Sequence, residues 1–127
     1  MRSFTIVLLA IIFTSCSNYT NTRDCDDFRT GTFVWEQESG GKLLKTTFER
    51  TEDLQIETFE GVVDTSRVEW INACEWRVIP INPKTNAESR AYLFKILNTT
   101  DNSYSFEFKQ SGRDQIYYGT ATKLSDE

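Results

Sequence analysis

Hydrophobic and polar residues alternate with a period of two along most of the chain. The clearest run is 104–108, in which aromatic residues alternate with serine and glutamate, and the runs 54–57 and 68–70 repeat the pattern. Because successive side chains of a β-strand point to opposite faces, such runs predict strands with one dry and one wet face. Turn signals rich in Gly, Asn, Asp and Ser separate them. The predicted strands are residues 30–38, 42–50, 53–60, 66–72, 75–81, 90–98, 104–110 and 115–123.

The connections between these strands are too short for the crossover helices that a parallel sheet requires. A flat antiparallel sheet of about eight strands would expose two edges and a wide apolar face, whereas a two-layer sandwich or a closed barrel buries both. Hairpin connectivity is unbroken from the first predicted strand to the last. We therefore expect an all-β fold, an antiparallel up-and-down meander of about eight strands closed into a small lipocalin-like barrel.

The parity of the aromatic residues defines the face that is expected to point into the barrel. The expected interior residues are Phe33, Trp35, Leu44, Phe48, Leu54, Ile56, Val68, Trp70, Trp76, Val78, Tyr92, Phe94, Ile96, Tyr104, Phe106, Phe108, Ile116 and Tyr118. Leu43, Phe59 and Leu93 have the opposite parity, which predicts a bulge or a small outer cluster. The glutamates of the strands alternate with the aromatic residues and are expected to face solvent.

An eight-stranded barrel can be filled by its own side chains or can hold one small ligand. The candidate lining of such a pocket is Trp35, Arg50, Trp70, Trp76, Phe94 and Phe106. The alternative is a packed core, because a small domain needs its largest side chains to remain folded. Arg50 shares the parity of Phe48, so inside the barrel it would need a carboxylate partner or the head group of an acidic ligand. At the end of its strand it would instead lie in water.

The N-terminus has the form of an export signal. Arg2 supplies a positive charge, and residues 4–13 form an apolar block interrupted by one Thr. The block is too short to cross a bilayer, which needs about 20 apolar residues. A secretory signal is the expected function, and a buried strand or a short core helix is the alternative.

The residues that follow this block, Phe13-Thr14-Ser15-Cys16, resemble a bacterial lipoprotein signal. The resemblance implies cleavage before Cys16, a lipid on its thiol and, because Ser17 rather than Asp follows, the outer membrane of the cell envelope. Phe13 and Ser15 depart from the most common form of the motif, and plain secretion is the alternative. The expected domains are a signal peptide over 1–15, a lipid-anchored polar tether over 16–27 and a β-barrel over 28–124.

The cysteine count is consistent with this assignment. Of the three cysteines, Cys25 and Cys74 remain once Cys16 carries lipid. In an oxidising compartment a disulfide between them is expected, and two reduced buried thiols are the alternative. Two cysteines without histidine or close spacing do not form a zinc site, so no metal site is expected.

Composition narrows the range of functions. The 127 residues include no His, which removes the Ser-His-Asp and Cys-His nucleophile systems. No nucleophile elbow or phosphate loop is present, so we expect neither an enzyme nor a cofactor. The formal charge of −5 disfavours binding to nucleic acid.

Four stretches together resemble a family of short bacterial exported proteins with no established activity. They are residues 25–33, Glu49-Arg50 with 55–57, residues 68–76 and residues 101–104. Because it asks nothing unusual of the barrel interior, the expected function is that of a monomeric envelope lipoprotein, a non-catalytic interaction or scaffold module for another envelope protein. The alternative function is a lipocalin-like binder of a small apolar or amphipathic ligand, although the Gly-x-Trp opening of true lipocalins is missing.

Overall fold

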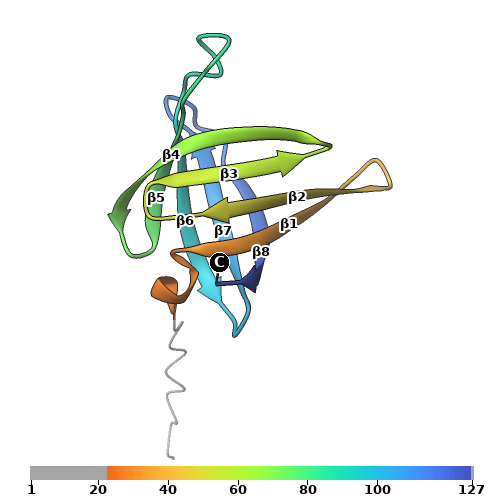
Figure 1. The fold of residues 1–127 in the computed structure, drawn as a ribbon, viewed down its shortest axis with the longest axis vertical. Coiled ribbons are helices and arrows are strands. Elements are labelled where there is room, and N and C mark those ends of the chain that lie inside the picture. The colour runs from red at the N-terminus through yellow and green to blue at the C-terminus, as the bar shows by residue number, and fades with distance from the viewer. Residues whose placement is uncertain (1–22, 127) are drawn as a thin grey trace, which may run out of the picture.

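A computed structural model describes residues 23–126, which form a closed antiparallel β-barrel (Figure 1). The strands are β1 (Gly31–Ser39), β2 (Lys42–Arg50), β3 (Leu54–Phe59), β4 (Val62–Asn72), β5 (Glu75–Pro80), β6 (Tyr92–Thr99), β7 (Ser103–Gln110) and β8 (Tyr117–Ser125). Each strand pairs with the next in sequence, and β8 pairs with β1 to close the barrel. The predicted fold class is confirmed.

Two tight turns set the register of the first four strands. Gly40 and Gly41 join β1 to β2, and both have positive φ angles, 59° and 78°. Glu60 and Gly61 join β3 to β4 with φ angles of 48° and 80°. Two-residue turns of this kind match the twist of a hairpin, so pairing begins immediately at Val62 opposite Phe59. The predicted start of this strand at residue 66 was therefore wrong by four residues.

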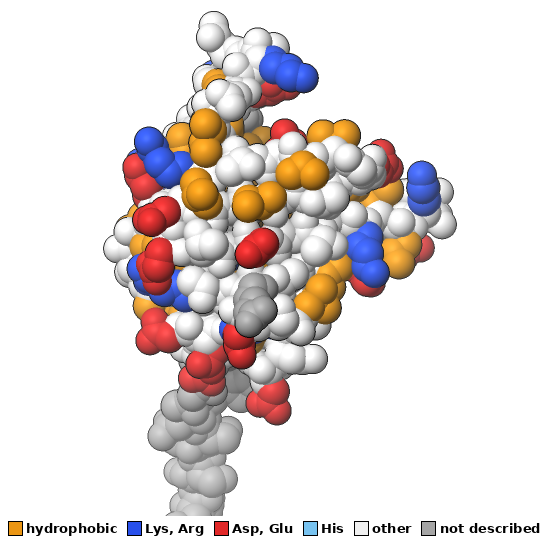
Figure 2. All heavy atoms as spheres, viewed as in Figure 1, with side chains coloured by type: hydrophobic (Ala, Val, Ile, Leu, Met, Phe, Trp, Pro, Cys, Tyr) orange, Lys and Arg blue, Asp and Glu red, His pale blue; other side chains and the backbone are white. Residues whose placement is uncertain are grey.

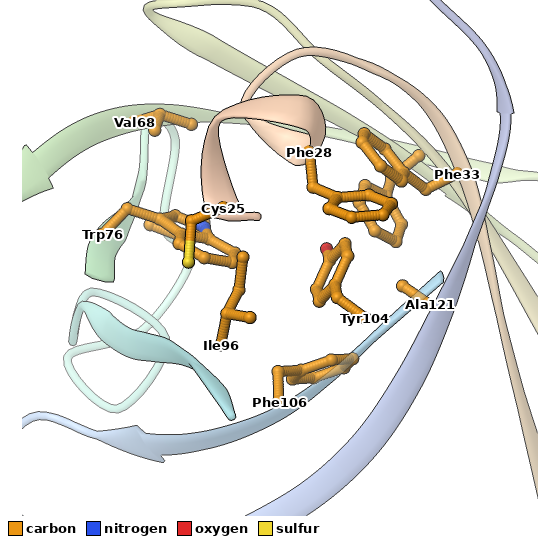
Figure 3. Close-up of a cluster of buried hydrophobic side chains, with 11 residues drawn as sticks. Cys25, Phe28, Phe33, Val68, Trp76, Ile96, Tyr104, Phe106 and Ala121 are labelled. Carbon is orange, nitrogen blue, oxygen red and sulfur yellow. The ribbon is translucent and has the colours of Figure 1, made fainter. Parts of the chain in front are cut away.

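A short 3-10 helix, η1 (Cys25–Phe28), lies across one end of the barrel, which we call the closed end (Figures 1 and 3). Cys25 and Phe28 are buried. The Cys25–Cys74 disulfide joins η1 to the connection between β4 and β5, which confirms the predicted pairing. On the opposite side, Lys123 Nζ donates a hydrogen bond to the carbonyl oxygen of Asp27 at 2.6 Å. The helix is thus attached to the barrel wall at both ends.

Behind η1 the barrel is filled by large side chains. Figure 3 shows Phe28 and Cys25 above a layer that includes Tyr104, Trp76 and Ile96. The buried hydrophobic cluster consists of Cys25, Phe28, Phe33, Phe48, Val68, Trp76, Val78, Ile96, Tyr104, Phe106 and Ala121. This cluster and the disulfide beside it both lie within residues 23–126.

Three residues expected in the interior, Leu54, Ile116 and Tyr118, are exposed instead. In β3, Gln55 lies opposite Arg50 and points into the barrel. Leu54 and Ile56, the residues on either side of it, therefore face outward. β3 carries apolar residues on both of its faces. Its pairing with β2 places the face that contains Phe59 inside the barrel. Hydrophobicity alone did not indicate this choice.

In β8 the inward-facing residues were predicted incorrectly for a different reason. Its inner face carries Tyr117, Gly119 and Ala121, which places Tyr118 outside. A Cβ atom on Gly119 would lie 2.7 Å from both the Phe106 ring and Trp35 Nε1. Small residues are required here because rings from two other strands occupy the space. An interior face predicted from bulky residues alone does not include such positions.

The first part of the chain is described only in part. Residues 23–27, which the sequence assigned to the tether, pack against the closed end of the barrel and include buried Cys25. The predicted signal peptide and the lipidation site Cys16 lie outside the described residues. No helix within residues 23–126 has the length and apolar character needed to cross a bilayer.

We predict that removal of the disulfide lowers stability without changing the fold. The bridge closes a loop with a sequence separation of 49, for which chain entropy gives about 4 kcal/mol. A Cys25→Ser/Cys74→Ser variant should show this loss in the free energy of unfolding in urea, and reductant should have no further effect on it. Equal stability of the variant and the oxidised wild type would contradict the prediction.

Candidate functional site

Arg50, at the end of β2, is the most completely buried charged residue described, with 1% of its surface exposed. Its Nη2 donates to the carbonyl oxygen of Phe28 at 2.5 Å, and its Nε donates to that of Arg29 at 3.0 Å. Both acceptors lie at the end of η1. The guanidinium therefore binds the carbonyl groups that this short helix leaves without partners.

Aromatic rings surround the same guanidinium. Its Cζ lies 4.5 Å from the centre of the Trp76 ring and 4.8 Å from that of Phe33. No ion pair joins Arg50 to a carboxylate within residues 23–126. Hydrogen bonds to neutral acceptors and the ring quadrupoles take the place of that partner. The sequence left open whether Arg50 would face a carboxylate, an acidic ligand or water; its burial shows that it does not lie in solvent at the end of its strand.

A series of polar side chains runs from Arg50 along the barrel interior. Arg50 Nη1 donates to Tyr104 Oη at 3.3 Å and to Gln55 Oε1 at 3.5 Å. Gln55 Nε2 in turn donates to Glu57 Oε1 at 2.6 Å. Glu57 lies opposite Asp64 in the pairing of β3 with β4. Two carboxylates therefore occupy the inner face of the barrel, contrary to the expectation that every strand glutamate faces solvent.

Burial raises the pKa of the Glu57 carboxyl above its ordinary value. The hydrogen bond from Gln55 lowers this pKa, and the nearby charge of Asp64 raises it further, but burial is the largest of the three effects. The pKa of the Tyr104 hydroxyl is also raised by burial, which exceeds the lowering by Arg50.

The end of the barrel opposite η1, which we call the open end, is less completely packed. Trp35, Phe108 and Tyr117 form a ring cluster there, with centroids 5.5 Å apart between the first two and 5.3 Å between the last two. All three point inward by register, yet Tyr117 is 50% exposed. Val62, which is inward by the register of β4, is 61% exposed. Inward-facing apolar side chains thus remain accessible at this end.

The six predicted pocket residues form one connected cluster that extends through the barrel interior. Arg50, Trp76 and Phe106 are fully buried, and Trp76 stacks on half-buried Phe94 with centroids 5.5 Å apart. Trp70 lies near the closed end, where its Nε1 donates to the carbonyl oxygen of Glu52 at 3.2 Å. The remaining residue, Trp35, lies towards the open end, and its ring packs edge-on against Phe106 with centroids 5.4 Å apart, so all six are linked by contacts between their side chains.

Several residues of the open end were not identified from the sequence as site residues. Glu57 and Asp64 were missed because acidic residues in strands are usually solvent-facing. Tyr117 was missed because it stands beside Tyr118 and the parity of the pair was assigned incorrectly. The only available signal was the hairpin register set by Glu60 and Gly61, which brings Glu57 opposite Asp64.

Among residues 23–126 no group of three or more His, Cys, Asp or Glu side chains could hold a metal ion. A scan against protein-family models and searches of the curated proteins and of the solved structures found no match. The class of protein defined by the fold is a small closed antiparallel β-barrel compatible with a lipocalin-like architecture. Any functional conclusion depends on the side chains that this barrel presents.

We predict that Arg50→Lys lowers the free energy of unfolding by about 2 kcal/mol. A lysine retains the buried charge but lacks the planar fork that binds two carbonyl oxygens at once. Urea unfolding of this variant and of Arg113→Lys, an exposed control in the β7–β8 connection, would measure the difference. Wild-type stability of the Arg50 variant would show that the fork is not required.

A second prediction concerns pH. Because the pKa of Glu57 is raised in the folded state, the folded protein holds this proton more tightly than the unfolded chain. Stability contributed by the protonated carboxyl is therefore present below the unfolded pKa and is lost as pH rises through the folded pKa. Glu57→Gln should reduce the fall in unfolding free energy between pH 4 and 7, while Glu49→Gln on the outer face of β2 should leave it unchanged. A parallel pH profile for the Glu57 variant and the wild type would contradict this.

Proposed function

We propose that this protein is an exported, membrane-tethered β-barrel that binds a small amphipathic molecule at its open end. The observation that carries the proposal is the difference between the two ends. At the closed end η1, Arg50 and the aromatic cluster exclude solvent, whereas at the open end Trp35, Phe108 and Tyr117 converge and stay partly exposed. Aromatic surface that points inward and remains accessible is typical of a ligand-binding end.

The charges of the interior favour one kind of head group. Glu57 and Asp64 line the inner face towards the open end, and the hydrogen bonds of Arg50 go to protein acceptors. A ligand that enters there would meet acceptors rather than cations. An apolar chain that carries an amine or another hydrogen-bond donor therefore fits better than a fatty acid.

The lipid anchor is supported by the sequence motif at Cys16 and is compatible with the position of the described N-terminus. The chain enters the described part of the molecule beside the closed end (Figure 1). Residue 23, where the description begins, is seven residues after Cys16, and a chain of that length reaches at most about 25 Å. An anchor at Cys16 would hold the closed end near the membrane and leave the open end facing the aqueous compartment.

An interaction or scaffold module is the second candidate, and the outer surface of β1–β4 favours it. Val34, Thr47, Thr58 and Val63 form one uncharged row across the four strands. Figure 2 shows several apolar side chains on this face of the molecule, with charged side chains between and around them. The uncharged row could contact another envelope protein without a large desolvation cost.

The two tyrosines of β8 provide a matched test of the ligand proposal. Tyr117 points inward and stacks on Phe108, whereas Tyr118 points outward with 67% of its surface exposed. We expect dodecylamine to quench the tryptophan fluorescence of a chain of residues 17–127 in a saturable manner. Tyr117→Ala should weaken this binding about tenfold because it removes buried aromatic contact, and Tyr118→Ala should not change it.

Dodecanoic acid serves as the head-group control, and its binding should be at least tenfold weaker. Equal effects of the two tyrosine substitutions would argue against binding inside the open end. If neither amphiphile binds below its critical micelle concentration, the ligand proposal fails and the scaffold candidate becomes the better one.

A further inference from the structure

A concave site lies on the outside of the barrel wall, next to the open end. This pocket of about 410 Å³ is bordered by β4, β5 and the two connections that follow β5 and β7. The β5–β6 connection rises above the wall in Figure 1 and forms one side of it. The lining residues are Arg67, Glu69, Arg77, Ile79, Ser89, Arg90, Ala91, Ser111 and Gly112.

The charge of this pocket is opposite to that of the chain. Three of its residues are arginines and one, Glu69, is acidic, so its formal charge is +2 in a chain whose formal charge is −5. Glu69 lies between two of the arginines, 3.4 Å from Arg67 and 3.5 Å from Arg77. A single carboxylate thus neutralises only part of the local positive charge and holds two guanidinium groups at the pocket wall.

Arg90 supplies the third guanidinium from a different element, and it forms no hydrogen bond or ion pair to another side chain within residues 23–126. Its Nη1 lies over Gly112, where a Cβ atom would come within 3.1 Å. Gly112 also has a φ of 80°, which a side chain would strain. The glycine thus leaves room for the guanidinium beside the pocket.

We propose that this pocket binds a phosphate group, either as free phosphate or a soluble phosphate monoester, or as the monoester head group of a lipid. Planar guanidinium groups bind phosphate oxygens in pairs, and three of them from three elements converge here. The hydroxyl-bearing residues Ser89 and Ser111 add neutral donors at the rim. This site is separate from the open end of the barrel, and the proposal does not depend on the ligand proposed there.

Inorganic phosphate is the first probe, titrated into ¹⁵N-labelled residues 17–127 and followed by amide chemical shifts of Ser89, Arg90 and Gly112. We expect saturable shifts that weaken as salt concentration rises. Arg90→Gln should weaken binding about tenfold, the loss expected for one charge-assisted contact. Arg113→Gln removes the same charge from the adjacent connection without touching the pocket and should leave the affinity unchanged.

Glu69→Gln tests whether the carboxylate within the pocket competes with phosphate for the two arginines beside it. It should tighten phosphate binding severalfold, because it removes the competing carboxylate and frees Arg67 and Arg77 for the ligand. Tm measured beside each titration verifies that these exposed substitutions leave the barrel folded.

Flotation with vesicles separates the two sources of the phosphate group. Phosphatidylcholine vesicles with and without phosphatidic acid are the probe, and the truncated chain lacks Cys16 and its anchor. Binding to phosphatidic acid that requires Arg90 but not Arg113 supports a lipid head group, and saturation by inorganic phosphate with the same dependence supports a soluble ligand. Failure of both probes, or equal losses in the Arg90 and Arg113 variants, would overturn the proposal.

Discussion

The buried guanidinium of Arg50 is the interaction on which the closed end of the barrel depends. It binds the last carbonyl oxygens of η1 from below while its faces contact the rings of Trp76 and Phe33. A four-residue helix has almost no internal hydrogen bonds, so it cannot hold its position by itself. The guanidinium supplies the missing donors from within the barrel, and the Cys25–Cys74 disulfide limits how far the helix can move away. Burial of the charge is tolerated because several weak partners replace one strong one.

Filling the closed end determines what remains at the open end. The large side chains close to η1, such as Trp76 and Tyr104, are fully buried, whereas Trp35 and Phe108 towards the open end are only partly buried. Towards the open end the inward positions carry Glu57, Asp64 and Tyr117, which are acidic or partly exposed. Side chains of this kind cannot form a dry core, because carboxylates lose stability when they are removed from water. The interior of the barrel is therefore closed to solvent at the end near η1 and remains accessible to solvent at the opposite end.

Much of the fold could be predicted from the sequence, because a period of two and short turns leave few alternatives to antiparallel hairpins. The disulfide followed from the cysteine count. The errors have a common cause: in β3 and β8 the hydrophobic pattern does not distinguish the two faces, and pairing with the neighbouring strand decides. Gln55 faces inward because it lies opposite Arg50, and Gly119 does so because Trp35 and Phe106 need its space. The site was harder to predict because the role of each residue depends on contacts with segments distant in sequence, such as those of Arg50 with η1.

β4 illustrates how one strand serves two different surfaces. Asp64 points into the barrel and Arg67 points to the outer pocket, and three residues along a strand separate them by about 10 Å. This separation is close to the Debye length at physiological salt, so the acidic interior and the basic pocket act largely independently. The remainder of the chain is acidic, which limits what the basic pocket can attract. An extended polyanion such as nucleic acid would meet acidic surface beyond the three arginines, whereas a compact anion that fits within the pocket would not. The distribution of charge therefore favours a small anionic group at this site.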